Sequence, residues 1–553
     1  MIRVAKSDRA RRYLNEWLKV VLPIRQMSKL ADIEVDTESV AEKGNPFKDP
    51  LELEKWREVY QSCNYEGLPF LDADLEWSIE EENKLVRILD ARIFAWVFIS
   101  FCSLDLIRRN INRVTADNFL QDLGLGTNDY NLGQTLYLVS FLCAELPGNL
   151  LSKRFGCEVV IPFQMVTWSV LCIFQACMVN KAGFLVLRVL IGFSQGGFIP
   201  DTILYLTYFY NSRELPLRLA VFWTAIPLFQ ILGSLLASGI LEMRGIHGLA
   251  GWRYLFIIEG ALSLAIALSS FYFMRTGPTE TGNKLFKRKS WFNERQTKIL
   301  VNRILRDDPS KGDMNNRQPV SLKEIWLTLS DYDIWPILIQ GIMAFIPFQP
   351  VTNYVTLILR EMGYSTFMSN ILAIPGQAWF LVNLPLLVLL SRYTKEKSIC
   401  VAVSNIFILP FIIALVALPN NTNNWVKYVL LTGILSQPYA HAILAAWVSQ
   451  SANSVRARAV GTSLYNMSYQ VGSIIATQIY RNDDKPYYDR GNKTILGICV
   501  FNIFFAFAAK GYYILRNKQK EKKWAQMSVE EKSAYLSNPP DKGMKHLNFR
   551  FTH

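Results

Sequence analysis

The sequence predicts an all-helical polytopic membrane protein, in which twelve transmembrane helices form two halves of six. The composition is the first reason, because 51% of the 553 residues are hydrophobic and 19% are charged, against about 25% charged in a typical soluble protein. The apolar residues also gather in blocks of roughly 20, the length that a helix needs to span the hydrocarbon of a bilayer. A long basic connector separates the first six blocks from the last six.

The apolar blocks define the predicted spans and domains. In the first half they lie near residues 91–111, 131–151, 159–179, 183–206, 217–241 and 253–274, and in the second half near 334–358, 368–390, 398–418, 425–447, 460–480 and 494–515. We therefore expect five regions: an N-terminal tail (1–88), a first six-helix half (89–274), a basic linker (275–332), a second six-helix half (333–515) and a C-terminal tail (516–553).

The distribution of charge predicts the orientation in the membrane. The net charge is +13, but Lys and Arg gather in the 275–323 connector, in the tail after residue 515 and in short turns that alternate with less basic loops. This pattern argues against nucleic acid as a partner, and by the positive-inside rule it places both termini and the connector in the cytosol. We expect no cleavable signal peptide, so the first span is expected to direct insertion. The expected location is the plasma membrane, with the endoplasmic reticulum and the vacuole as alternatives.

The connector contains one segment with helical spacing of apolar residues. Trp291, Phe292, Ile299, Leu300 and Leu305 are spaced as on one amphipathic helix, which we expect to lie along the membrane surface. A shorter amphipathic stretch at 13–24 suggests a second surface helix.

The sequence offers no support for an ATP-driven pump or an enzyme. It has no GxxxxGK[ST] phosphate-binding loop, no nucleophile–base pair and no metal-ligand spacing among its cysteines and histidines. We expect no catalytic residue, no cofactor and no metal, so any uphill transport must draw on an ion gradient.

The first span carries the most informative charges. Asp105 lies three residues before Arg108 and four before Arg109, so the acid and at least one base can share a helix face. Charge in this position costs a few kcal/mol or more, which favours a site for an anion, with Arg108 binding substrate and Asp105 able to carry a proton. The alternative is that the arginines lie in the outer interface and snorkel to water.

Two further acids lie inside predicted spans. Glu145 is followed by Pro147, which frees a backbone carbonyl, and by Gly148, which allows close helix packing. An acid in apolar surroundings can bind a proton near neutral pH, so Glu145 is the first candidate for proton coupling; permanent pairing with an arginine is the alternative. Glu259 is a weaker candidate, for which a structural ion pair is favoured.

The fourth span places Arg188, Gly192 and Gln195 on one face. A guanidinium and an amide beside bare backbone suit an anion, because the Arg fork binds two oxygens. The alternative is that Arg188 holds the bundle together through backbone carbonyls.

Polar residues of the second half give further candidates. Gln349 and Asn353 lie on a span that Pro347 and Pro350 interrupt, where a substrate contact or a gate is expected; hydrogen bonding between helices is the alternative. His441 is the only histidine in a predicted span, and it either contacts substrate or is a packing residue.

Local motifs resemble those of a known family. The turn Asn149-Leu150-Leu151-Ser152-Lys153-Arg154-Phe155-Gly156 resembles the signature turn of the major facilitator superfamily, with Lys153 where Asp is common; Lys153, Arg154 and Gly156 would form its gating turn. The preceding Glu145-Leu146-Pro147-Gly148-Asn149, together with 108–111, 188–200, 251–260 and 456–460, resembles the fungal allantoate permeases, also called anion:cation symporters.

This resemblance covers roughly 90–515 and implies the major facilitator fold with proton-coupled uptake of a small organic or inorganic anion. Stretches at 129–135, 301–309 and 480–486 resemble the yeast member that transports sulfonates and inorganic sulfur anions, so these are the leading substrates. Allantoate or a carboxylate vitamin such as pantothenate, biotin or nicotinate is the alternative, and a non-transporting nutrient sensor is a third reading. The expected partners are the small anion, protons and the lipid bilayer, and the protein is expected to be a monomer.

Overall fold

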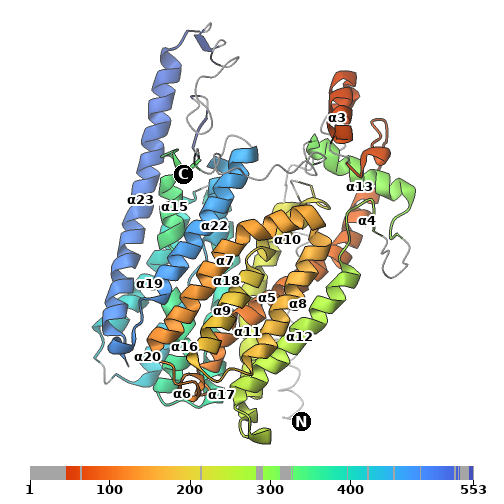
Figure 1. Ribbon diagram of the computed structural model, residues 1–553. Helices are drawn as coiled ribbons and strands as arrows, with labels where there is room; N and C mark the ends of the chain where they lie inside the picture. The colour runs from red at the N-terminus through yellow and green to blue at the C-terminus, as the bar shows by residue number, and fades with distance from the viewer. Residues whose placement is uncertain are drawn as a thin grey trace, which may run out of the picture.

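The computed structural model describes residues 45–551, except 63–64, 212–213, 282–289, 310, 312–325, 327, 395, 420–421, 452–454, 486, 529–530, 533–534, 536–546 and 548. Every regular element in this part of the chain is helical. The helices form one bundle, shown in Figure 1. The stretch at 13–24 lies outside the described residues.

The first half contains six rods in chain order. They are α5 (Ala95–Val114), α7 (Thr127–Phe155), α8 (Cys157–Gln175), α9 (Lys181–Gln195) with α10 (Phe198–Thr207), α11 (Leu215–Ile240) and α12 (Gly251–Phe273). A short helix, α6 (Phe119–Asp122), joins the first two rods. Before α5, helix α4 (Ile79–Leu89) and the π-helical turn η3 (Asp90–Phe94) run directly into it.

The second half repeats this plan with more interruptions. Its rods are α15 (Trp335–Met343) with α16 (Gln349–Glu361), α17 (Thr366–Leu372) with α18 (Ile374–Thr394), α19 (Ser398–Ala417), α20 (Asn424–Leu435) with α21 (His441–Ser451), α22 (Val455–Thr477) and α23 (Asp489–Gln526). The predicted architecture of twelve helices in two halves is therefore confirmed.

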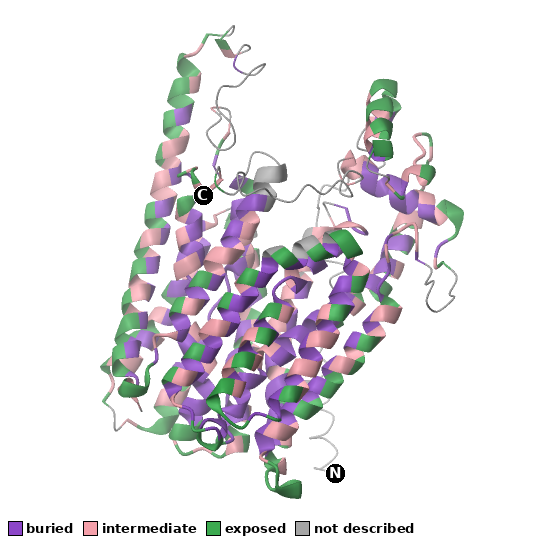
Figure 2. Cartoon of the chain, viewed as in Figure 1, coloured by how far each residue is buried: buried purple, intermediate pink, exposed green. Residues whose placement is uncertain are grey.

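Seven of the described helical stretches are long and apolar enough to cross a membrane by themselves. Among the other rods, α5 carries charges and α15–α16 and α20–α21 are divided into short pieces, which breaks their long apolar windows. Large apolar side chains remain on the outside of the bundle: Phe163, Trp379 and Phe504 are 60–71% exposed. Figure 2 shows buried residues inside the bundle and exposed ones along its flanks, as expected for a surface that contacts lipid.

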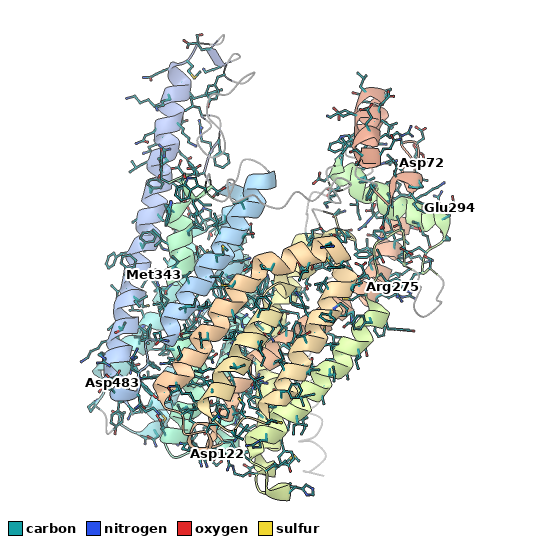
Figure 3. The ribbon with its side chains drawn as sticks, in the orientation of Figure 1. Asp72, Asp122, Arg275, Glu294, Met343 and Asp483 are labelled. Carbon is teal, nitrogen blue, oxygen red and sulfur yellow. The ribbon has the colours of Figure 1, made fainter. Side chains whose placement is uncertain are left out.

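We name the two ends of the bundle by the segments found there. The linker end carries α4, the linker helix α13 (Glu294–Asp307) and the last turns of α23, and the far end carries α6 and α17. Figure 3 shows Arg275 and Glu294 near the linker end and Asp122 and Asp483 at the far end.

Two rods of the second half are unwound near their middle. Residues 344–348 separate α15 from α16, and residues 436–440 separate α20 from α21. Side-chain amides from neighbouring helices satisfy freed carbonyls: Asn502 Nδ2 donates to the Met343 oxygen at 2.7 Å and Asn383 Nδ2 to the Ser436 oxygen at 2.6 Å. Unwound backbone is tolerated at membrane depth only where protein supplies such partners.

The predicted linker helix exists, and its apolar face packs against protein. Val301 and Leu305 of α13 form a small core with Phe47 and Tyr60 of the N-terminal segment, while Leu300 belongs to the main core. The sequence does not reveal this partner because the N-terminal segment is polar overall and lies more than 200 residues away.

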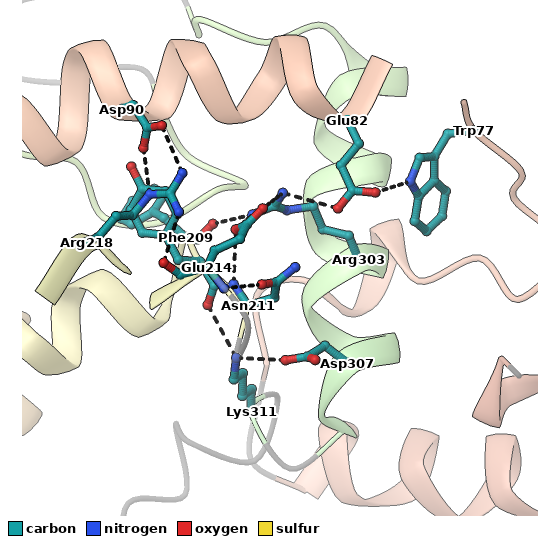
Figure 4. A network of polar contacts seen from close by, with 11 residues as sticks. Trp77, Glu82, Asp90, Phe209, Asn211, Glu214, Arg218, Arg303, Asp307 and Lys311 are labelled. Carbon is teal, nitrogen blue, oxygen red and sulfur yellow. Dashed lines mark hydrogen bonds and ion pairs between the residues drawn. The ribbon is translucent and has the colours of Figure 1, made fainter. Parts of the chain in front are cut away.

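Ion pairs fix this N-terminal segment and α13 to the first half. Arg303 is fully buried and pairs with Glu214 at the start of α11 at 2.7 Å and with Glu82 of α4 at 3.4 Å. Arg218 holds Asp90 through two hydrogen bonds of 2.7 and 2.8 Å. Figure 4 shows this network.

Candidate functional site

The charged motif of α5 lies at the centre of the bundle, between the two halves. Two adjoining cavities open there, of about 90 and 70 Å³, each with room for several water molecules. Arg108 and Arg109 line both of them, together with Ile226, Tyr439 and Tyr469. The first cavity extends toward Asn112 and Asn353, and the second toward Glu145 and Pro200.

The two arginines differ in their partners. Arg109 Nε donates to Asp105 Oδ1 at 2.8 Å, four residues earlier on the same helix. The side-chain amide of Gln230 is oriented so that both its oxygen and its nitrogen form hydrogen bonds. The oxygen accepts from Arg109 at 2.8 Å, and the nitrogen donates to Gln377 of the second half. Arg108 instead lies 5.2 and 5.8 Å from the ring centroids of Phe141 and Tyr137. No ion pair or hydrogen bond to Arg108 is found within the described chain, so its charge is available to a solute.

Two carboxylates line the second cavity. Asp105 is 2% exposed, and its Oδ2 atom accepts no hydrogen bond from the residues that are described. Glu145 is 6% exposed and, within the part of the chain described, forms neither an ion pair nor a hydrogen bond. The permanent pairing with an arginine that the sequence left open is not observed for Glu145.

Arg188 lies one layer behind the cavity wall. The residue is 1% exposed, and its guanidinium donates to Gln134 Oε1 at 2.5 Å and lies 4.3 Å from the ring centroid of Tyr137. Tyr137 in turn donates to Gln195 Oε1 at 2.6 Å. Gln134 and Tyr137 line the first cavity, whereas Arg188 and Gln195 do not.

Close helix packing holds this second layer in place. A side chain at Gly192 would meet the Tyr137 carbonyl oxygen at 2.3 Å, and one at Gly196 would meet the Phe141 carbonyl oxygen at the same distance. This small-residue pair, four positions apart, lets α9 approach the backbone of α7. It therefore sets Arg188 and Gln195 directly against Tyr137.

The polar candidates of the second half contact the first cavity. Gln349 donates to Ser473 Oγ at 3.0 Å, and Asn353 accepts from Asn112 of the first half at 3.4 Å. Both side chains line the first cavity. Gln349 and Asn353 thus form the hydrogen bonds between helices that the sequence offered as the alternative, and both also line the cavity.

Beyond the first cavity, hydrogen bonds join the halves at the far end. Tyr354 donates to Asn131, Thr135 and Thr477 lie 3.0 Å apart, and Thr356 donates to the Asn112 carbonyl oxygen at 2.6 Å. Asn131 also donates to the Tyr480 carbonyl oxygen at 2.7 Å. These bonds close the bundle near α6, α16 and α17, at the lower end of Figure 1.

His441 begins α21 inside an aromatic cluster. It lies 2.8 Å from the Tyr465 hydroxyl through Nδ1, and its ring is 4.9–5.5 Å from the rings of Trp223, Tyr439, Tyr465 and Tyr469. It is 5% exposed and lines the second cavity. Its position is that of a packing residue that also lines a cavity, so a contact with substrate stays a prediction.

Glu259 lies apart from the cavities. It is 1% exposed and pairs with Arg113 at 3.5 Å inside the first half, which fits the structural pairing favoured for it. The Lys153–Gly156 turn lies at the linker end, where Gly156 has φ 88° and joins α7 to α8; the Lys153 side chain is outside the described part, and Arg154 is exposed. No group of three metal-ligating side chains occurs among the described residues.

Sequence reasoning missed several cavity residues. Gln134, Gln230, Gln377 and Tyr469 line the cavities, and each comes from a predicted span. A signal was present for the three glutamines, because an amide inside an apolar block needs a partner or a cavity. Tyr469 gives no such signal, since tyrosine is common in spans near interfaces.

Comparison with known proteins agrees with this geometry. Residues 97–477 match the family model of the Major Facilitator Superfamily. The chain is 63% identical over 519 residues to an uncharacterized transporter of Saccharomyces cerevisiae, covering 94% of this chain and 95% of that protein. It is 24% identical to the major facilitator-type transporter hxnP of Emericella nidulans, over 80% of this chain and 88% of the relative.

Solved structures share the fold. An inward-facing, unoccupied structure of a bacterial homologue of the human lysosomal transporter Spinster aligns with a TM-score of 0.57 at 15% identity, covering 78% of this chain and 98% of that one. A partially occluded inward-open structure of the Escherichia coli xylose transporter XylE gives 0.56 at 14% identity, covering 75% and 97%. Since the family model spans more than half of the chain and a close relative covers nearly all of it, the protein is a multi-pass membrane transporter, and not an enzyme, that belongs to the major facilitator superfamily.

Proposed function

We propose that this transporter carries a small anion across the membrane together with protons. The observation that carries the proposal is Arg108, a cation that lines both central cavities and has no acidic partner among the described residues. An unpaired charge in the middle of a membrane protein is costly, and a bound anion is the partner that would offset that cost. Arg109, held by Asp105, adds less net charge.

The small size of the two cavities supports a compact solute, and their amide and hydroxyl lining supports one with several oxygen acceptors. Gln134, Gln349, Asn353 and Ser473 offer side-chain hydrogen bonds around the first cavity. A sulfonate or sulfur oxyanion presents three or more acceptor oxygens to such donors, which is the substrate class that the family resemblance favours. A carboxylate, as in allantoate or a vitamin, is the alternative.

Proton coupling rests on Glu145. An anion that enters a cell with a negative interior moves against about 2.3 kcal/mol per charge per 100 mV. Cotransport with more than one proton for each monovalent anion reverses that sign. Glu145 lines the second cavity without a partner among the described residues, so it can exchange a proton with the solvent of that cavity. Asp105 is the second candidate.

The experiment is uptake of labelled isethionate, sulfate, allantoate, pantothenate and biotin at pH 5 and pH 7, in cells that lack their own carriers. We expect accumulation of one sulfur-containing anion that rises at pH 5 and collapses with a protonophore. Uptake of pantothenate, biotin or allantoate alone selects the alternative substrate. Accumulation that a protonophore leaves unchanged contradicts proton symport, and binding without uptake of any of the five favours the sensor.

We further propose that the protein lies in the plasma membrane, with the linker end and both termini in the cytosol. We also propose that it is a monomer. The basic linker and C-terminal tail support this orientation. A tag placed after residue 553 should be reachable by antibody only after permeabilisation of the plasma membrane. Labelling of that tag on intact cells would reverse the orientation.

A further inference from the structure

The two central cavities differ in how their polar side chains are partnered. In the first cavity, Gln349 donates to Ser473 and Asn353 accepts from Asn112, so these amides already form hydrogen bonds. In the second cavity, polar side chains without a partner among the described residues gather. Because buried polar groups are normally hydrogen-bonded, this gathering indicates a place where a solute supplies the missing partners.

Gln470 of α22 is the clearest of these side chains. It is 6% exposed and lines the second cavity. Its Oε1 atom accepts no hydrogen bond from the residues that are described. Asn466, one turn earlier on the same helix, lines the cavity too, but it is only half-buried. A missing partner is therefore more costly for Gln470.

The second cavity holds more acceptors than donors. Asp105 Oδ2 and the Glu145 carboxylate, like Gln470 Oε1, receive no hydrogen bond within the described chain. Arg108 is the unpaired cation beside them. The oxygens of an anionic head group only accept hydrogen bonds, so they can satisfy Arg108 but not these acceptors. A solute that uses the whole site must bring a donor as well.

The walls of the second cavity suit carbon atoms. Its apolar lining residues are Phe101, Leu104, Phe141, Ile199, Pro200, Trp223 and Ile226. Such surfaces contribute little to binding a bare inorganic anion, whereas they pack well against a short carbon chain. Arg108 lines both cavities and so marks their boundary. A head group held at Arg108 can direct the rest of an organic solute into the second cavity.

We propose that Gln470 recognises the uncharged end of a short organic anion, by accepting a hydrogen bond from a donor group there. This inference rests on the proposed function, because the anionic end is held at Arg108. The substrate class is then an organic anion with a hydroxyl or amide N–H opposite its charge. Isethionate, a hydroxyethyl sulfonate, belongs to this class, whereas sulfate has no such end.

The test compares anions that differ only at this end. Isethionate and propanesulfonate have the same charge and nearly the same size, but a methyl group replaces the hydroxyl in the second. Hydroxypropanoate, with its hydroxyl on the terminal carbon, and butanoate form the matching pair with a carboxylate head. The kinetics of initial uptake are measured for all four at one pH, in cells that lack their own carriers.

Two variants locate the effect. Gln470→Met removes the amide and keeps the length of the side chain. Gln175→Met is the matched control, because Gln175 is 1% exposed and its amide has no partner in the described part of the chain, but it lines neither central cavity. Surface biotinylation normalises each rate to the amount of protein in the membrane.

We expect the wild-type protein to prefer isethionate over propanesulfonate about tenfold in kcat/KM, the effect of one hydrogen bond whose acceptor would otherwise stay unpaired. The carboxylate pair should differ in the same direction. Gln470→Met should reduce each preference to about twofold and leave the uptake of propanesulfonate and butanoate unchanged. Gln175→Met should keep the wild-type preference.

Equal kcat/KM values within both pairs in the wild type, or an undiminished preference in Gln470→Met, would overturn the role of Gln470. An equal loss of uptake of all four anions in Gln470→Met, at normal surface amounts, would also overturn it, since the residue would then serve transport in general. Wild-type uptake of allantoate, pantothenate or biotin but of none of these four would overturn the short substrate class. Uptake of no anion at all would overturn the proposed function itself.

Discussion

The guanidinium of Arg188 lies 4.3 Å from the ring centroid of Tyr137, and Tyr137, not Arg188, forms the cavity wall. The same guanidinium donates to Gln134, which also lines the cavity. Arg188 therefore orients two side chains that line the cavity. Arg108 and Arg109 are the arginines that line both cavities, and only Arg109 is held by a carboxylate in the described part of the chain.

The first prediction tests whether Arg108 binds the anion. Arg108→Gln should lower the kcat/KM of uptake by about 10- to 100-fold, the value of one charge-assisted hydrogen bond to the anion. The protein should reach the membrane in normal amounts, because Arg108 has no ion pair to lose among the residues that the structure describes. Uptake kinetics alongside surface biotinylation measure both quantities, and wild-type kinetics would exclude Arg108 from the site.

A second prediction concerns Arg188→Lys. The lysine retains the charge but cannot, as the planar guanidinium does, both lie over the ring of Tyr137 and donate to Gln134. We expect KM to rise about tenfold, since the wall residues lose their orientation while Arg108 still attracts the anion. A wild-type KM for this variant, measured by uptake kinetics, would contradict the positioning role of Arg188.

The third prediction contrasts two buried acids. Glu145→Gln mimics the protonated form, and we expect it to lose accumulation driven by a pH gradient while it keeps exchange of labelled for unlabelled substrate. Its expression should stay normal because Glu145 has no partner among the described residues. Accumulation that still follows the pH gradient in this variant would move the proton site to Asp105 or Glu259.

Glu259→Gln is the matched comparison for that experiment. It leaves the buried Arg113 without its carboxylate, which costs about 3–5 kcal/mol when a buried pair is broken. We expect a lower yield and a lower melting temperature, measured on purified protein. A stable Glu259→Gln protein without pH-driven accumulation would assign coupling to Glu259.

A fourth prediction tests the closure of the far end. Tyr354→Phe removes the hydroxyl that donates to Asn131 of the other half, a loss of about 1 kcal/mol. The population with an open far end should rise about fivefold. A cysteine at Thr352, which lines the first cavity, reports this as faster labelling by an impermeant maleimide, in a background with the native cysteines replaced.

Tyr364→Phe serves as the control for that measurement. Tyr364 is also near the far end, and no hydrogen bond from its hydroxyl occurs in the described part of the chain. Equal labelling rates in the two variants would show that the Tyr354 bond does not hold the halves together.

The fifth prediction concerns the N-terminal segment packed on α13. Arg303→Ala removes bonds to Glu214 and Glu82 and should cost about 2–3 kcal/mol. We expect the linker to be cut faster by trypsin in permeabilised membranes. Lys298→Ala, which removes only an exposed pair with Glu294 on the same helix, should be cut at the wild-type rate.

The fold could be predicted from the sequence because the length and apolarity of a spanning helix are local properties. The α5 motif was equally local: the i, i+4 spacing of Asp105 and Arg109 is enough to form their pair. Which residues line the same cavity wall, in contrast, depends on contacts between helices that are far apart in the sequence. Arg188 and Gln195 share a helix face as expected, but that face packs on Tyr137, which sequence spacing alone does not reveal.

The same limit applies to α13. Its amphipathic pattern predicts an apolar face that must be covered, but a pattern does not distinguish lipid from protein as the cover. Phe47 and Tyr60 supply that cover, and only a three-dimensional structure shows that they reach it. Gln230 and Gln377 belong to opposite halves, so their contact could not be predicted from sequence spacing either.

The unwound segments at 344–348 and 436–440 have a mechanical consequence. Both belong to the second half, and the side-chain amides of Asn502 and Asn383 donate hydrogen bonds to carbonyl oxygens at these breaks. An amide can exchange one carbonyl for another at little cost, whereas a continuous helix must break its own ladder to bend. Bending during the transport cycle would then be concentrated at these two joints of the second half.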